Sequence, residues 1–339
     1  MAGVDLITVE KDENGMRLDR WFKSHYPGLG FGPLQKLLRS GQIRVDGGRV
    51  KSDSRMQEGQ KVRIPPSLVA ESQSKNHDPL TANTIRNRED SDVLKAMTLY
   101  EDSKVFVFNK PQGLAVQGGS GLTRHLDKML ESIRNKKGEK PRLVHRLDRE
   151  TSGILVVART RGAASALAKE FRGRRTEKTY WAIVKGVPKP RQGKISNWLA
   201  KMRDENGDDY MTVVKHGTPD SDHAVTDYRV IEASGPNLAW LELSPVTGRT
   251  HQLRVHTQNM RHPIIGDPKY FDIENWQLPG GIQNKLHLHA RRIRIPHPDG
   301  GVIDVTAPLP PHMLQTWNLL GFDPDLVEED EEEKVFFKK

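Results

Sequence analysis

Cysteine is absent from the 339-residue sequence. Disulfide bonds, thiolate catalysis and cysteine-ligated zinc are therefore excluded, and any chemistry must use carboxylate, imidazole, phenol, amine, guanidinium or hydroxyl groups. Long apolar runs are absent as well, and the mean hydropathy is −0.67, so the sequence predicts no membrane-spanning helix. Residues 1–10 carry neither a secretory nor an organellar targeting pattern. We therefore expect a cytoplasmic protein with no membrane partner.

The charge is unevenly distributed along the chain. The whole sequence carries a net +9, but residues 323–339 contain eight acidic side chains and three lysines. That segment contributes −5, so residues 1–322 carry +14. A body this basic indicates a polyanionic partner, most simply RNA, although positive charge can also serve solubility alone. Residues 323–339 themselves are predicted to form an acidic, disordered tail.

The most informative stretch is residues 142–153, with the sequence R-L-V-H-R-L-D-R-E-T-S-G. This charged loop leads directly into the β-branched run at residues 153–158, which is typical of a buried strand. The carboxylate of Asp148 is therefore presented at the mouth of a core strand, where a rigid element fixes a reactive group that stays reachable. The alternative is that Asp148 only pairs with Arg146 or Arg149 to shape a turn.

Residues 1–64 are predicted to form a small α/β module. Helical patterns cover residues 17–22 and 33–40, and strand patterns cover residues 42–46 and 61–64. Polar residues without periodicity follow, and they predict a flexible linker over residues 65–92.

The order of elements in this module, with the sequence G-Q-I-R-V-D-G at residues 41–47, resembles the S4 RNA-binding module. The resemblance implies that basic side chains of the second helix and the hairpin contact phosphates, namely Lys36, Arg39, Arg44 and Lys51. A generic helix and hairpin domain with exposed lysines is the alternative.

Residues 93–322 are predicted to form one large α+β domain. Strands outnumber helices in it and come in hairpins, such as residues 226–232 with 238–243. We therefore expect a mixed, largely antiparallel sheet with the active cleft across it. A glycine-rich loop at residues 116–121 precedes a predicted helix, but no lysine with serine or threonine follows, so a nucleotide-binding loop of the Walker type is not indicated.

The thirteen histidines raise the question of a metal site. His251 and His256 are five residues apart, which places them on different faces of a helix, and His287 with His289 would need a third converging ligand. Phosphate contacts and packing explain these residues more simply. We expect neither a metal nor a cofactor.

The string H-R-L-D-x-x-T-S-G at residues 145–153 is similar to the signature of the RluA-type pseudouridine synthases. Five further segments match the family in the same order: N-K-P-x-G at 109–113, K-x-Y at 178–180, T-G-R-T-H-Q-L-R at 247–254, G-D-P-x-Y at 266–270 and L-H-L-H-A at 286–290. The resemblance covers roughly residues 99–309. Gln117 departs from the histidine that the family frequently carries there.

The resemblance implies roles for individual side chains. Asp148 matches the catalytic aspartate, Tyr180 matches the tyrosine that stacks on the target uracil, and Arg249 matches the arginine that pairs with the aspartate. On pattern alone, Tyr180 is one more core aromatic of a strand. The segments around these positions add expected contacts to RNA from His145, Arg146 and Arg254.

The implied reaction is the isomerisation of specific uridines to pseudouridine. With the S4-like module, the chain looks closest to the RluC-type enzymes that act on large-subunit ribosomal RNA, and transfer RNA is the second choice of substrate. Two other readings stay open. A hydrolytic RNA glycosidase would need a second carboxylate, from Glu150 or Asp267, and a catalytically silent RNA-binding ribosome-assembly factor would need only the charge. We expect a monomer.

Overall fold

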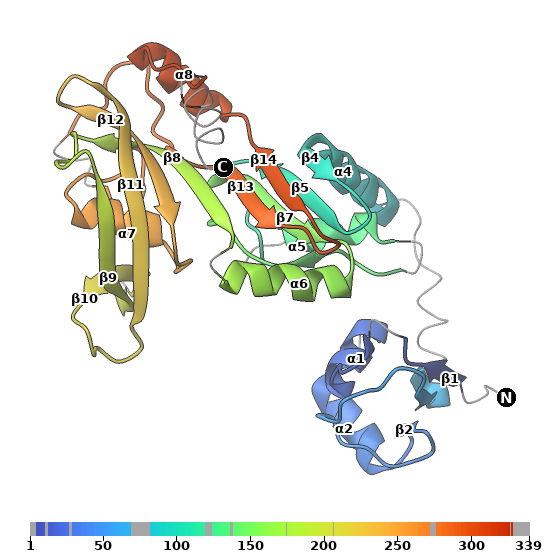
Figure 1. Cartoon of the computed structure of the whole chain (residues 1–339). Coiled ribbons are helices and arrows are strands. Elements are labelled where there is room, and N and C mark those ends of the chain that lie inside the picture. Colours follow the sequence, from blue (N-terminus) through green and yellow to red (C-terminus); the bar gives the residue numbers. More distant parts are fainter. Residues whose placement is uncertain are drawn as a thin grey trace. The chain divides into compact units, whose positions relative to one another are not determined.

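The fold is described from a computed structural model of the chain. It describes residues 5–10, 13–26, 29–68, 82–118, 124–135, 138–173, 175–205, 207–271, 276–325 and 327, without the side chains of residues 82–86. Two compact units are present, Met1–Arg86 and Asn87–Lys339, and each is treated by itself (Figure 1).

The smaller unit has the predicted helices and a three-stranded antiparallel sheet in the order β1-β3-β2. Its elements are β1 (Asp5–Thr8), α1 (Leu18–His25), α2 (Phe31–Arg39), β2 (Arg44–Val45) and β3 (Lys61–Ile64). One face of α1 buries Leu18, Trp21 and Phe22, which fits their helical spacing. Leu68 also packs into this core, so the unit extends a few residues past the expected boundary at residue 64.

The linker predicted at residues 65–92 is wrong at its carboxyl-terminal end. Helix α4 (Ala82–Ala96) begins inside it, and the larger unit starts at Asn87 rather than at residue 93. The helix is anchored by Leu94 in the core and by Asp90, whose buried carboxylate accepts a hydrogen bond from Arg124 at 3.0 Å. Residues 69–81 lie outside the described part of the chain.

The larger unit is built on an 11-stranded sheet, and it confirms the expected α+β class with a largely antiparallel sheet. The order is β10-β9-β11-β12-β8-β13-β7-β5-β4, with β14 on β13 and β6 on β7. Only the pairing of β13 with β7 is parallel among these described pairs. The strands are β4 (Thr98–Glu101), β5 (Val105–Lys110), β6 (Arg142–Leu143), β7 (Ser152–Ala158), β8 (Glu177–Lys185), β9 (Gln192–Arg203), β10 (Asp209–Val214), β11 (Asp222–Ser234), β12 (Leu238–Pro245), β13 (Leu288–Pro296) and β14 (Val302–Thr306).

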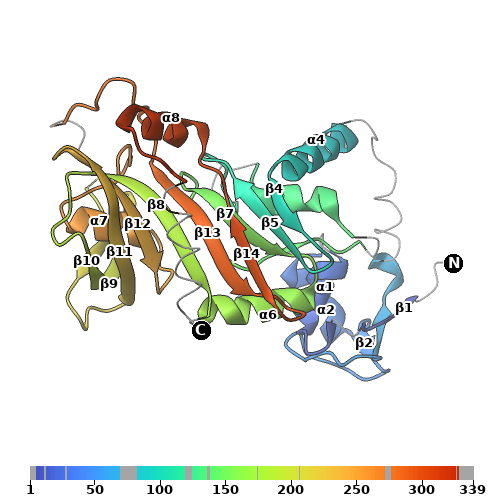
Figure 2. The ribbon, with the colours of Figure 1, turned by 45° about the horizontal axis from the view of Figure 1, so that its top comes forward.

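Helices cover the sheet in separate places (Figures 1 and 2). They are α5 (Leu126–Met129) continued by the 3-10 turn η2 (Leu130–Ile133), α6 (Arg161–Arg172), α7 (Gln252–Asn259) and α8 (Pro311–Leu320). Helix α7 packs on β9 and β11 through Val255, Leu199 and Ala224. The glycine-rich loop falls partly on residues 119–123, outside the described part.

Helix α8 closes a tryptophan cluster on β8 and β12. Trp317 of α8 lies 5.3 Å from Trp240 and 6.4 Å from Trp181, measured between ring centroids. Val327 is buried in the same cluster, so the disordered tail predicted from residue 323 is wrong at this position. Residues 328–339 lie outside the described part.

The parallel contact of β7 with β13 requires a glycine. Gly153 has φ +104°, and a Cβ there would lie 2.3 Å from the carbonyl oxygen of Ala290 on β13. Both the conformation and the space therefore exclude a side chain. This contact follows directly after the loop that carries Asp148, so the glycine fixes where that loop leaves the sheet.

We predict that Gly153→Ala lowers the free energy of unfolding by about 3 kcal/mol or more, because backbone must move apart at the sheet centre. Gly162→Ala is the matched control, since a Cβ at that helical position meets nothing within 4 Å and alanine favours the helix. Urea unfolding of both variants measures the difference. Equal stability of the two would contradict the packing argument.

Two buried histidines predict acid sensitivity. His287 bonds to Thr316 at 2.8 Å and His289 to Ser152 at 2.9 Å, and both rings are fully buried. Burial lowers the pKa of His287 to about 4 and that of His289 to about 3. The unfolded chain takes up these protons below pH about 6.5, whereas the folded protein does not.

Stability should therefore fall as the pH drops from 6.5 to 5, by about 2 kcal/mol for each of these two rings. Urea midpoints at pH 7 and pH 5 test this. His289→Asn should make the decline less steep, whereas replacement of the exposed His216 by Asn should leave it as in the wild type. If His289→Asn loses as much stability between pH 7 and pH 5 as the wild type, His289 does not contribute to the acid sensitivity.

Candidate active site

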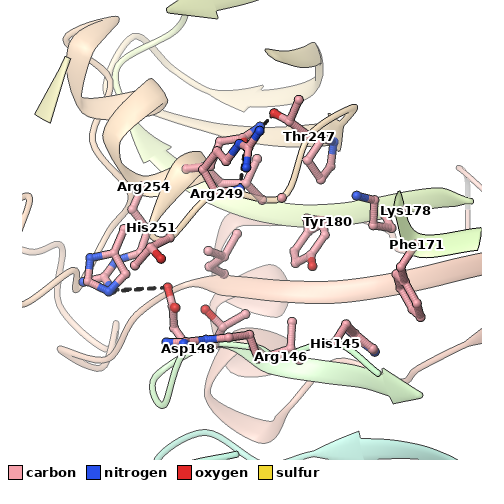
Figure 3. A pocket seen from close by; sticks show the side chains of 18 of the residues that line it. His145, Arg146, Asp148, Phe171, Lys178, Tyr180, Thr247, Arg249, His251 and Arg254 are labelled. Carbon is pink, nitrogen blue, oxygen red and sulfur yellow. Dashed lines mark hydrogen bonds and ion pairs between the residues drawn. The ribbon is translucent and has the colours of Figure 1, made fainter. Parts of the chain in front are cut away.

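A pocket of about 650 Å³ opens on the larger unit where the loop before β7, the start of β8 and the turn into α7 meet (Figure 3). Among its described lining residues, Asp148 is the sole carboxylate. The other chemically useful side chains that line it are His145, Arg146, Arg172, Lys178, Tyr180, Arg249, His251 and Arg254. The charged loop and the turn at residues 247–254, noted separately in the sequence, thus meet at one site.

The loop that carries Asp148 is held by a buried lysine. Lys110, at the end of β5, is fully buried, and its ammonium donates to the carbonyls of Pro111, Leu114 and Arg149 at 2.9, 2.9 and 3.1 Å. All three donors of the ammonium are therefore satisfied. Burial lowers the pKa of Lys110 to about 8. The N-K-P-x-G segment acts in this way as a brace for the residue that follows Asp148.

Arg254 is the cation closest to the carboxylate of Asp148 among the described guanidinium groups. Its Nη1 lies 3.6 Å from Asp148 Oδ2, while Nε and Nη2 donate to the two oxygens of Asp267 at 2.8 and 2.7 Å. The Arg254 side chain is 5% exposed and that of Asp267 is fully buried. A two-pronged bond of this kind fixes the plane of the guanidinium, so Arg254 presents its remaining nitrogen to Asp148.

Asp267 is held in turn by backbone. One of its oxygens accepts the N–H groups of Lys269 and Tyr270 at 2.9 and 3.1 Å. Gly266 precedes it with φ +69°, and a Cβ there would lie 2.0 Å from the carbonyl oxygen of Lys285. The G-D-P-x-Y segment therefore serves to anchor the arginine that faces the carboxylate.

Two arginines lie elsewhere than the sequence predicted. Arg249 was expected to pair with Asp148, but its Nη1 lies 3.3 Å from Asp222 and its Nε donates to the carbonyl of His223. Arg254 was expected to contact RNA, but it is buried behind the carboxylate. The reason is the position of α7, which begins at Gln252. Arg249 stays in the exposed turn before the helix, and Arg254 lies within its first turn.

His251 is a second neighbour of Asp148, and from the sequence it was considered as a possible metal ligand. Its Nε2 lies 3.8 Å from Asp148 Oδ2, and its Nδ1 lies 2.8 Å from the hydroxyl of Tyr270. That hydroxyl accepts the N–H of Met211 at 3.0 Å, and its own proton is free to bond to Nδ1. In that arrangement the ring proton of His251 is on Nε2, toward Asp148. Burial lowers the pKa of His251 although Asp148 opposes the shift.

His251 also has an unusual backbone. Its φ of 52° and ψ of 18° lie in the left-handed region, which is uncommon for a residue with a Cβ. Such strain persists where surrounding contacts hold it and is concentrated at functional sites. No spacing in the sequence could have revealed this conformation.

Strand β8 forms the wall of the pocket opposite the Asp148 loop. Tyr180 packs between two apolar clusters and reaches into the pocket (Figure 3). Burial first, and the charge of Asp148 second, raise the pKa of Tyr180, so its hydroxyl keeps its proton. An aromatic ring on this wall offers a flat apolar face to a base.

His145 does not fit the expected contact with RNA phosphates. Its Nε2 accepts the N–H of Val156 at 2.8 Å, and its ring stacks on Phe171 at 4.3 Å between centroids. Burial, with the charge of Lys178 next in weight, lowers the pKa of His145 to about 3. The ring is therefore neutral and serves as wall. Arg146, by contrast, is exposed at the pocket.

The basic residues expected to bind RNA in the smaller unit differ in their exposure to solvent and in their bonds within the protein. Lys36, Arg39 and Lys51 are exposed. Arg44 is half-buried and donates to the carbonyls of Gly41 and Gly47, both at 3.1 Å, so its guanidinium also holds the turn of the hairpin.

The histidine pairs considered as metal ligands are engaged elsewhere. His256 bonds to the hydroxyl of Thr226 at 2.9 Å, and His287 and His289 bond to Thr316 and Ser152 as described above. Within the described residues, no three histidine, aspartate or glutamate side chains converge as a metal-binding group. None of the described helices is long and apolar enough to span a bilayer.

Comparison with known proteins places this fold and pocket in a family. Residues 104–259 match the family model described as RNA pseudouridylate synthase, and the chain belongs to this family of isomerases. It is similar to proteins named ribosomal large subunit pseudouridine synthase C. The one from Haemophilus influenzae is 36% identical over 301 residues, 88% of this chain and 89% of that protein. The one from Escherichia coli is 34% identical over 311 residues, 90% and 93% of the two chains.

A solved structure supports the fold. Human RNA pseudouridylate synthase domain containing 4 superposes with a TM-score of 0.59 at 29% identity, over 71% of this chain and 98% of that one. The predicted family and fold class are thereby confirmed.

We predict that replacing Arg254 lowers kcat strongly and that replacing Arg249 lowers it little. Arg254→Gln should lower kcat about 100-fold or more, because Asp148 loses its fixed cation and Asp267 is left buried without one. Arg249→Gln should lower kcat less than fivefold, because its partner is an exposed carboxylate. Single-turnover pseudouridine formation measures both, at a temperature where circular dichroism shows each variant folded. Equal losses would contradict the assignment.

Proposed function

We propose that this protein isomerises specific uridines to pseudouridine in RNA of the large ribosomal subunit, with Asp148 as the catalytic carboxylate. The observation that carries the proposal is the lone carboxylate of the pocket, held at 3.6 Å from the fixed Arg254 and 3.8 Å from His251. The names of the relatives support the substrate, and the net +14 of residues 1–322 supports a polyanionic one.

The reaction needs little machinery. The C1′–N1 bond of the uridine breaks, the uracil turns within the pocket, and C5 bonds to C1′. C5 loses its proton and N1 gains one. No atom is added or removed overall, and no redox step occurs. A single carboxylate serves this chemistry either by adding to C1′ or by removing the 2′ proton. Both routes require an ionised and oriented Asp148, which is what Arg254 supports.

Tyr180 has the role of holding the detached uracil in this proposal. Its ring lines the pocket on the wall opposite the Asp148 loop, and stacking keeps a base in place while allowing rotation in its own plane. The uridine must first leave its stack in the RNA. Arg146, exposed at the pocket, is suited to contact the RNA around it.

Hydrolysis is less well supported by the same geometry. A glycosidase normally uses two carboxylates facing the scissile bond. Glu150 does not line the pocket and lies 3.5 Å from Arg149. Asp267 has both oxygens engaged by Arg254. Neither is placed to activate a water at C1′.

The smaller unit acts as an S4-like RNA-binding module in this proposal. Lys36, Arg39 and Lys51 present exposed charge, as RNA phosphates require. The protein works in the cytoplasm as a monomer.

The decisive experiment is to map pseudouridines in ribosomal and transfer RNA from cells that lack the gene, complemented with wild type, Asp148→Asn or Glu150→Gln. Sites in large-subunit RNA should vanish and return with wild type and Glu150→Gln, but not with Asp148→Asn. Asparagine is nearly isosteric, so loss of turnover would report the missing charge.

Two results would overturn parts of the proposal. If pseudouridines are lost only from transfer RNA, the substrate is transfer RNA and not RNA of the large ribosomal subunit. Full restoration by Asp148→Asn, or no lost site at all, would favour an RNA-binding factor without catalysis.

A further inference from the structure

Among the cations that line the pocket, Lys178 is half-buried and has no partner among the described residues. It forms no hydrogen bond or ion pair with any of them. It lies two residues before Tyr180 on β8, so both side chains point from the same face of the strand. Figure 3 shows Tyr180 between Asp148 and Lys178.

The positive charge of Lys178 is not compensated by a free carboxylate among the described residues of the pocket. The one described carboxylate of the pocket, Asp148, is already matched by Arg254. Arg172, exposed at the end of α6, lines the pocket as well and adds a second positive charge. Burial lowers the pKa of Lys178, which means that its charged form is costly where it stands. A half-buried ammonium without a partner indicates a negative group supplied by a ligand.

We propose that Lys178 binds a backbone phosphate next to the uridine that stacks on Tyr180. This inference rests on the proposed function, because it takes the ligand to be a uridine within RNA. Lys178 would then fix the distance from the phosphate to the base, and so the position of C1′ relative to Asp148. The ammonium of a lysine is a compact point charge, which is suited to binding a phosphate.

The uracil itself is the other source of negative charge, since it becomes electron-rich once the C1′–N1 bond is broken. The phosphate is favoured because the exposed Arg172 lines the pocket together with Lys178, so that two cations are available to an RNA backbone. A phosphate is also charged before the reaction starts, whereas the uracil is charged only during it. The two sources therefore predict different kinetic effects.

The first test is calorimetric titration of the full-length protein with uridine, uridine 5′-monophosphate and uridine 3′-monophosphate. Wild type should bind one of the monophosphates about tenfold more tightly than uridine, which is the effect of one charge-assisted hydrogen bond. Lys178→Met should bind all three alike, and Lys178→Arg should keep the preference. Lys185→Met is the control, because Lys185 lies on the same strand outside the pocket.

Retention of the phosphate preference by Lys178→Met would overturn the proposal, and so would its absence from the wild type. This titration needs no knowledge of the RNA substrate. Should wild type fail to modify large-subunit RNA, the proposed function falls while the titration still decides the role of Lys178.

The second test uses an RNA oligonucleotide around a uridine mapped as above, with one neutral methylphosphonate at each linkage in turn. Wild type should lose about tenfold in kcat/KM at one linkage next to the uridine, through KM. Lys178→Met should show a similar loss on unmodified RNA and no further loss at that linkage. Independent losses would contradict a direct contact, and a fall in kcat alone would place Lys178 at the uracil.

Discussion

The buried ion pair of Arg254 and Asp267 is the constraint on which the site depends. Both groups are out of water, so each is tolerable only with the other in place. The pair ties α7 to the turn that follows Gly266, and it leaves one guanidinium nitrogen for Asp148. A surface arginine would lose conformational freedom on pairing with the carboxylate, whereas Arg254 is ordered when the protein folds. The field at Asp148 is therefore set before any RNA arrives.

The remaining features of the pocket extend the same arrangement. Lys110 holds the Asp148 loop by donating to three backbone carbonyls. His251, which bonds to Tyr270, lies beside the carboxylate of Asp148. The pocket is also lined by the cations of Arg146, Arg172 and Lys178. The pocket thus combines charges that are fixed by bonds within the protein, such as Arg254, with cations that have no partner among the described residues.

Much of this architecture was predictable from the sequence. Alternating and β-branched runs identified the main strands, and the charged loop before β7 identified Asp148. The helix α4 was not found, because its polar residues show no apolar stripe and its anchors are one aspartate and one leucine. Val327 was missed for a similar reason, since a single apolar residue in an acidic segment gives no periodic signal.

The unexpected positions of Arg249 and Arg254 had another cause. Both residues belong to one short motif, and either spacing is compatible with a contact to Asp148. The start of α7 decides between them, and helix boundaries are the least certain part of a sequence prediction. Likewise, the left-handed conformation of His251 and its contact with Tyr270, which is distant in the chain, leave no mark in the local sequence.

The position of β13 in the sheet has a consequence for how the protein is made. Asp148 precedes β7 and Tyr180 lies on β8, but these two strands are joined through β13, which is synthesised more than a hundred residues later. While the chain emerges from the ribosome, the two walls of the pocket have no strand between them. The catalytic cleft is thus completed near the end of translation, and a nascent chain carries its aspartate without an assembled site to act on RNA.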